Sequence, residues 1–190
     1  MATIQIADQD RTLRDAAEIS EFLARFHIWY RRFEGSDELA ADASQEEVLA
    51  AYDEPIRKLS AEGGYATADV IDIKPDTPNL DAMLDRFNKE HWHDEDEVRF
   101  IVKGRGLFHV HPKEGPVFSI EVVAGDMINV PRGTHHWFDL CQDRTIRAIR
   151  LFQDKSGWTP HYTGSAEETL HQPLCFGPSY VPVEPFASRI

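Results

Sequence analysis

Residues 91–99 read His91-Trp92-His93-Asp94-Glu95-Asp96-Glu97-Val98-Arg99. Three side chains that can bind a metal, those of His91, His93 and Glu97, lie within this stretch. If the stretch is extended, alternation along a strand places these three and Arg99 on one face, unless the acidic Asp94–Asp96 run makes a turn. Two imidazoles and a carboxylate can form a metal site with open coordination positions. A neighbouring guanidinium can hold an anionic ligand of that metal.

Composition narrows the possible classes of protein. The chain has 190 residues, which suits one domain with a sizeable core, and its formal net charge is −13. This balance argues against nucleic acid or an anionic membrane surface as a partner. The N-terminus lacks the apolar core of a signal peptide, and no apolar run approaches the length of a membrane span. We therefore expect a soluble, cytoplasmic protein, and a monomer.

The two cysteines, Cys141 and Cys175, are far too few for a disulfide scaffold. Because thiols stay reduced in the cytosol, we expect both to be reduced and structural.

The first half of the chain alternates helical and extended patterns. Apolar residues at three- and four-residue spacing predict a helix over 12–26, and Ser44 with Glu47 forms a capping-box pattern for a second helix. Pro55 should kink or break that helix, and Gly63-Gly64 should end it. A third helix is expected at 79–88, and strands at 3–7, 27–33 and 68–74.

From residue 90 the pattern changes to short β-prone runs separated by Gly, Pro and charged turns. The expected strands are 98–103, 107–111, 117–123, 126–130, 135–140 and 145–152. Gly104-Arg105-Gly106 is a hairpin signal. Many short strands at close spacing indicate an antiparallel sandwich or barrel. The prediction is a mainly β protein: helices and strands over 3–90 packed on a barrel core at 90–155, with an irregular tail at 156–190.

A second motif, Gly125-x5-Pro131-x-Gly133-x2-His136, follows the first in order. Together they resemble the two motifs of the cupin superfamily, whose members fold as a double-stranded β-helix, or jelly-roll barrel. The resemblance implies a single cupin domain over 1–190 and a metal site of His91, His93, Glu97 and His136. Such a set leaves two positions open on an octahedral ion and suits Fe(II), Ni(II), Mn(II) or Zn(II).

His135 competes with His136 for the fourth ligand position. Adjacent strand residues face opposite ways, so only one of the two should reach the metal. The motif spacing favours His136, which also shares parity with Phe138, and His135 is then expected on the outer face. His109 and His111 share one face of the preceding strand. We expect them either to lie on the outer face of the barrel or to support the metal ligands from outside the coordination sphere.

A closer resemblance covers about residues 3–165. Asn88–Phe100, Gly104–Phe108, Pro131–Asp139, Ala148–Phe152 and Gly157-Trp158 are similar to the acireductone dioxygenase family, enzymes of methionine salvage. The run Glu97-Val98-Arg99-Phe100 is more specific than the general cupin pattern. The chain departs from the family at His135, where members often carry a small residue or proline.

This resemblance implies roles for particular residues. Arg99 would be catalytic and hold the charge of a substrate dianion. The pocket would be lined by Phe100, Phe138, Arg150 and Trp158. Glu90 and Asp96 would act in conformational change or metal incorporation, although a solvated acidic surface explains them equally simply.

The resemblance also implies a reaction. One Fe(II) or Ni(II) per chain would act on an acireductone, 1,2-dihydroxy-5-(methylthio)pent-1-en-3-one, with O2. Two other readings remain: a different cupin enzyme, such as another dioxygenase or a sugar isomerase, and a non-catalytic cupin that binds a ligand. A non-catalytic cupin would be expected to lack part of the set of metal ligands.

Overall fold

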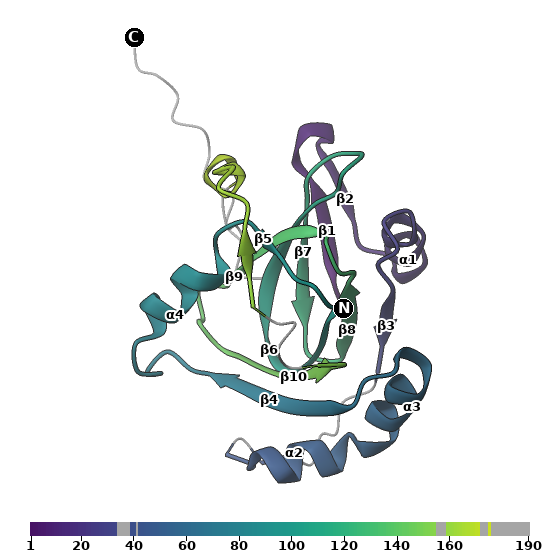
Figure 1. Cartoon of the computed structure of the whole chain (residues 1–190), viewed down its shortest axis with the longest axis vertical. Helices are drawn as coiled ribbons and strands as arrows, with labels where there is room; N and C mark the ends of the chain where they lie inside the picture. Colours follow the sequence, from purple (N-terminus) through teal and green to yellow (C-terminus); the bar gives the residue numbers. More distant parts are fainter. Residues whose placement is uncertain (34–38, 41, 155–158, 172–174, 176–190) are drawn as a thin grey trace.

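Strand β6, Glu97–His111, joins the two sheets of the molecule in this computed structural model, which describes residues 1–33, 39–40, 42–154, 159–171 and 175. Its first half pairs with β8 (Asp126–Val130) and β10 (Ile146–Phe152). Its second half pairs with β7 (Phe118–Val123) and β9 (His135–Leu140). All these pairs are antiparallel. One long strand therefore belongs to both sheets, and the sheets wrap into a barrel (Figure 1).

The first sheet has the order β11-β5-β9-β6-β7-β1-β2. Its remaining strands are β1 (Thr3–Ile6), β2 (Arg11–Leu13), β5 (His91–Trp92) and β11 (His161–Tyr162). The second sheet adds β4 (Thr67–Ile73) beside β10 and β3 (Tyr30–Arg32) beside β8. One apolar cluster fills the space between the sheets and includes Ile4, Phe108 and Ile128. A second cluster packs Phe100 and Ile149 of the second sheet against Val48, which is helical, and Tyr52, which lies between two helices.

The predicted hairpin at Gly104-Arg105-Gly106 is wrong, because β6 runs through all three residues. Gly104 has a φ of +74°, and a Cβ atom there would lie 2.1 Å from the backbone oxygen of Thr145. The pairing of β6 with β10 also shifts register between Arg147 and Ala148. Glycine at 104 therefore permits a close approach between two backbones where the strand passes from one sheet to the other.

The helices cover the outside of the barrel (Figure 1). They are α1 (Ala16–Ala24), α2 (Gln45–Ala51), α3 (Asp53–Gly63) and α4 (Leu80–Phe87), and a 3-10 turn, η1, spans Ala7–Gln9. The first helix starts later than predicted because Arg11–Leu13 pairs with β1. No helix of the described residues is long and apolar enough to cross a membrane.

The local signals for the second helix are confirmed. Ser44 and Glu47 form a reciprocal capping box at the start of α2. The helix breaks at Tyr52, so that Pro55 lies in the first turn of α3, where its missing N–H costs nothing. Gly64 caps α3 in the left-handed conformation.

Two expectations about the C-terminal part need correction. The segment from 159 to 171 is not irregular throughout, because it contains β11 and a 3-10 turn, η3 (Glu167–Leu170). Cys141 and Cys175 are not free thiols but form a disulfide. Cys141 lies directly after β9 and is buried, so the link ties the chain beyond η3 to the barrel, a contact between distant segments that their sequence spacing did not reveal.

Gly104 and Gly133 provide a matched test of the close approach between the backbones at Gly104 and Thr145. Both have nearly the same positive φ, +74° and +73°, but a Cβ at Gly133 would meet nothing within 4 Å. We expect Gly133→Ala to lower the free energy of unfolding by about 1 kcal/mol, the cost of the left-handed conformation. Gly104→Ala should cost at least about 2 kcal/mol more, because the backbones must separate. Urea unfolding of both variants measures this, and equal losses would show that the close approach has no energetic weight.

Candidate metal centre

Four side chains that can bind a metal converge inside the barrel, and we call them the first centre: His91, His93, Glu97 and His136. Their ligand atoms all lie within 4.8 Å of one another. Each residue is at most 5% exposed, so the cluster is enclosed by protein. Three imidazoles and one carboxylate form a donor set that suits first-row divalent ions.

The strand arrangement explains why these residues meet. His91 on β5 is paired directly with His136 on β9, and their ring centroids are 4.6 Å apart. The stretch 91–99 is not one continuous strand, since β5 ends at Trp92 and β6 begins at Glu97. The alternative of a turn in the acidic run is therefore the correct one.

The acidic turn is anchored on both sides. Asp94 binds the His161 ring at 2.7 Å, and Glu95 accepts a hydrogen bond from the backbone of Asp154 at 2.8 Å. Asp96 accepts a hydrogen bond from the Arg132 backbone at 3.0 Å. These bonds fix the turn that returns Glu97 to the side of the two histidines.

Backbone carbonyls orient all three imidazoles. Nδ1 of His91 lies 2.6 Å from the Lys89 oxygen, and Nδ1 of His136 lies 2.9 Å from the Thr134 oxygen. The corresponding distance from His93 to the Thr159 oxygen is 3.4 Å. Because a carbonyl oxygen only accepts, Nδ1 carries a hydrogen in each bond. Nε2 points into the centre, where it donates to Glu97 when protonated and offers its lone pair to a metal when neutral. Such outer hydrogen bonds are typical of metal-binding histidines.

The carboxylate of Glu97 contacts two of the histidines of the first centre and the guanidinium of Arg99. One carboxylate oxygen lies 2.9 Å from Nε2 of His136 and 3.3 Å from Nε2 of His93. The other lies 2.8 Å from the guanidinium of Arg99. Burial raises the pKa of Glu97, but Arg99 and the histidines outweigh burial and hold that pKa well below its usual range.

Burial in the first centre also lowers the pKa values of Arg99 and His91. Burial lowers the pKa of Arg99 to about 10, which leaves the guanidinium charged at neutral pH. Burial, and then the nearby His136, lower the pKa of His91 to about 4. A neutral His91 is the form that can bind a metal.

A cavity opens from the first centre. Its empty space, counted together with the solvent at its opening, is about 580 Å³. Besides the first centre and Arg99, its walls are apolar: Ile71, Ile73, Leu84, Phe87, Ile101, Phe108, Phe138, Ile146 and Ala148. The pocket therefore combines one charged end with a hydrophobic interior.

The predicted pocket residues have different positions. Phe138 lines the cavity. Phe100 does not, because it points to the outer face of the second sheet and packs against Tyr52, with ring centroids 4.8 Å apart. Arg150 lies beside Arg99 on the neighbouring strand, but its guanidinium forms a bidentate pair with Asp69 at 2.7 and 2.6 Å. Trp158 lies outside the described residues.

Several cavity residues were not recognised from the sequence. Ile101 shares the parity of Glu97 and Arg99 along β6, and this signal was available. Leu84 and Phe87 belong to the apolar stripe of α4, and such a stripe does not by itself distinguish a cavity wall from a packing surface.

Glu90 and Asp96 are not simply a solvated acidic surface. Glu90 is 2% exposed and contacts Ser165, Thr163 and His111. Burial raises the pKa of Glu90, but hydrogen bonds from these three residues produce a net lowering. Asp96 is partly exposed and bound to the turn that follows β8.

The comparisons with known proteins agree with this geometry. Residues 2–160 match the model of the ARD/ARD' family. A protein of Picosynechococcus sp. named acireductone dioxygenase is 42% identical over 174 residues, which cover 92% of this chain and 99% of that protein. A protein of Stutzerimonas stutzeri with the same name is 44% identical over 81% of this chain and 84% of its own length.

A solved structure is similar throughout its length. Acireductone dioxygenase from Bacillus anthracis, with a cadmium ion in its active centre, matches with a TM-score of 0.79 and 37% identity. The match covers 85% of this chain and 98% of that one. The fold of this chain is accordingly the cupin barrel that the sequence motifs predict.

Acid should destabilise the metal-free protein through His91. The folded pKa of about 4 lies below the ordinary histidine value of 6.5, so the unfolded state binds the proton first as the pH falls. The contribution is constant above about pH 6.5 and is lost between 6.5 and 4, to a total on the order of 3 kcal/mol. Unfolding by urea at several pH values should show a shallower decline in His91→Gln, and equal slopes would contradict the shift.

Substitution should also distinguish the two adjacent histidines. His136→Ala removes a ligand atom of the first centre and should weaken binding of the tightest equivalent of Ni(II) by at least about 100-fold. His135→Ala should leave that equivalent nearly unchanged. Competition with a chromophoric chelator measures both, and the opposite ranking would exclude His136 as the fourth ligand.

Proposed function

Because the chain belongs to the ARD/ARD' family, we propose that it oxidises 1,2-dihydroxy-5-(methylthio)pent-1-en-3-one with O2 in methionine salvage. With Fe(II), the products would be 2-oxo-4-(methylthio)butanoate and formate. With Ni(II), they would be 3-(methylthio)propanoate, formate and carbon monoxide. The observation that carries the proposal is the buried set of three imidazoles and a carboxylate with Arg99 at the charged end of an apolar cavity.

The donor set fits the metal that this reaction requires. His91, His93, Glu97 and His136 would be the ligands, since each imidazole presents Nε2 and the carboxylate is ionised. When bound, Fe(II) or Ni(II) would act as a Lewis acid that favours ionisation of a chelating enediol. The ligand residues suit both ions, so we propose that the ion supplied determines the products.

Arg99 would hold the charge of the substrate. Its side chain is 12% exposed and lies against Glu97, next to where an enediolate would enter. A buried guanidinium stabilises an added negative charge more strongly than water-exposed charges do. Its pairing with Glu97 keeps it oriented before substrate binds, which reduces the reorganisation needed.

The apolar wall would receive the rest of the substrate. Phe108 and Phe138 form an edge-to-face pair with centroids 4.9 Å apart, and Ile101 lies on the same wall. A methylthio tail packs favourably on such aromatic and aliphatic groups. These residues would also exclude water from the electron-rich enediolate.

Product analysis tests the proposed function. Metal-free protein would be loaded separately with Fe(II) and Ni(II), given the acireductone in air, and its products identified. We expect the 2-oxo acid and formate with Fe(II), and carbon monoxide with Ni(II). Absence of both product sets from protein that contains one equivalent of metal would refute the proposal, and identical products from the two ions would refute the metal dependence.

Replacement of Arg99 should separate chemistry from metal binding. Arg99→Met keeps the length of the stem but removes the charge, and we expect kcat/KM to fall by about 100-fold or more with metal content retained. Arg147→Met is a matched control: Arg147 is also buried and paired, with Asp72 at 2.6 Å, but does not line the cavity. Its folded fraction should retain activity. Equal losses in the two variants would assign Arg99 a structural role only.

A further inference from the structure

A second cluster of possible metal ligands lies on the other face of the first sheet. It consists of Glu90, His111 and His135, whose ligand atoms all lie within 4.8 Å of one another. None of them belongs to the first centre. His111 and His135 are directly paired across β6 and β9, whereas His136 is paired with Val110 and faces the barrel interior. The tandem His135-His136 therefore presents one imidazole to each face of β9.

Both imidazoles of the second cluster are directed at one carboxylate oxygen. Nδ1 of His111 lies 2.5 Å from Oε1 of Glu90, and Nδ1 of His135 lies 3.7 Å from the same atom. Two ligand atoms on a tetrahedral ion with bonds of about 2.1 Å are about 3.4 Å apart. The observed separations of 2.5 and 3.7 Å lie on either side of this value, so small side-chain rotations would form the site.

The other carboxylate oxygen is already held in place. Oε2 of Glu90 accepts hydrogen bonds from the hydroxyls of Thr163 and Ser165. Carboxylates that bind metals are commonly oriented by such outer partners. The arrangement leaves Oε1 for the two imidazoles.

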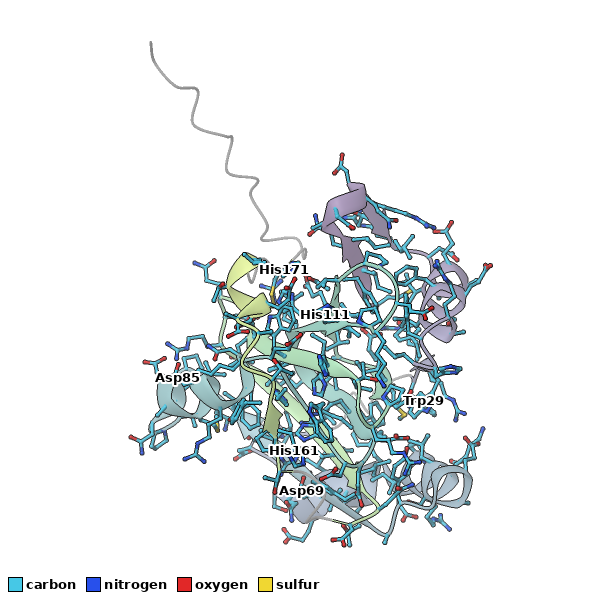
Figure 2. The ribbon with its side chains drawn as sticks, turned by 45° about the horizontal axis from the view of Figure 1, so that its top comes forward. Trp29, Asp69, Asp85, His111, His161 and His171 are labelled. Carbon is cyan, nitrogen blue, oxygen red and sulfur yellow. A yellow bond between two sulfur atoms is a disulfide. The ribbon has the colours of Figure 1, made fainter. Side chains whose placement is uncertain are left out.

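The two histidines of the second cluster are partly exposed to solvent, so a hydrated ion can reach them. The side chain of Glu90 is 1% exposed, but those of His111 and His135 are 35% and 39% exposed. Figure 2 shows His111 in the same upper part of the molecule as His171. A net charge of −13 favours the approach of cations in general.

We propose that Glu90, His111 and His135 bind a second divalent ion of the zinc type, separate from the first centre. The two imidazoles would bind through Nδ1, with their hydrogen on Nε2, and Glu90 through Oε1. Water would complete a four-coordinate set of two histidines and a glutamate. The Nδ1–H of His111 that now binds Glu90 would be replaced by the ion, as expected for a ligand that must be deprotonated.

The ion would stabilise the chain beyond β11. Glu90 contacts Thr163 and Ser165, and its backbone oxygen accepts from the Thr163 N–H at 3.1 Å. Residues 163–171, which we call the capping segment, continue to His171, whose ring lies 5.6 Å from that of Trp137 on the same outer face. Fixing the Glu90 carboxylate would hold the start of this segment on the sheet.

Calorimetric titration of the metal-free full chain with Zn(II) alone tests the proposal. We expect two equivalents in the wild type at concentrations chosen near the affinity of the second, and only one at the same concentrations in His111→Ala and in His135→Ala, because the second affinity should fall at least about ten-fold. The first equivalent serves as a fold control within each sample. His136→Ala should show the converse, losing the tight equivalent and keeping the second.

A matched control distinguishes this site from incidental binding to surface histidines. His27 is exposed, lies outside the second cluster and has a φ of +59°, which asparagine tolerates. His27→Asn should retain both equivalents. One equivalent in the wild type, or a second equivalent that persists in both cluster variants, would overturn the site.

Hydrogen exchange tests the consequence for the capping segment. The second equivalent should slow amide exchange in residues 163–171 of the wild type but not of His135→Ala. Unchanged exchange after two equivalents have bound would overturn the stabilising role.

Discussion

The buried Glu97 carboxylate is the constraint on which the rest of the structure depends. A charge at this depth is costly unless it is paired, and Glu97 is paired on one side with Arg99 and on the other with two imidazoles. These partners come from β6 itself, from the residue that follows β5 and from β9. The carboxylate is stable only when these segments meet, so the same contacts that compensate its burial also assemble a metal-binding group. Because β6 belongs to both sheets, the centre lies where the two halves of the barrel join.

How far the sequence predicts the structure depends on the range of the interaction. The capping box at Ser44 and the left-handed Gly64 are local, and both were predicted correctly. The convergence of His91, His93, Glu97 and His136 was predicted through the resemblance to the two cupin motifs. Gly104 was misread because a glycine that allows a close backbone approach has the same local pattern as one in a turn. Phe100 was misplaced because alternation along β6 sends it to the helix-covered face, and the disulfide was missed because Cys141 and Cys175 meet only through the tertiary fold.

The two faces of the first sheet differ in how their polar groups are satisfied. Inside, imidazole Nδ1 groups are held by backbone carbonyls, so the ligand atoms are preoriented and protected from water. Outside, Glu90 is held by hydroxyls of the capping segment while its histidine partners remain partly exposed. The inner arrangement suits an ion that must meet a substrate in a dry cavity. The outer arrangement suits an ion that keeps water and links two segments of the chain.

The tandem histidines of β9 also bear on which changes of loop length this barrel could survive in evolution. Insertion of one residue between β8 and β9 would slide β9 by one position and exchange its two faces. His135 would then replace His136 inside, so the centre would still receive an imidazole. The next inward position, however, would receive Trp137 in place of Phe138, and the larger indole would occupy part of the cavity. Selection on this loop would therefore act through the shape of the substrate pocket sooner than through the supply of a metal ligand.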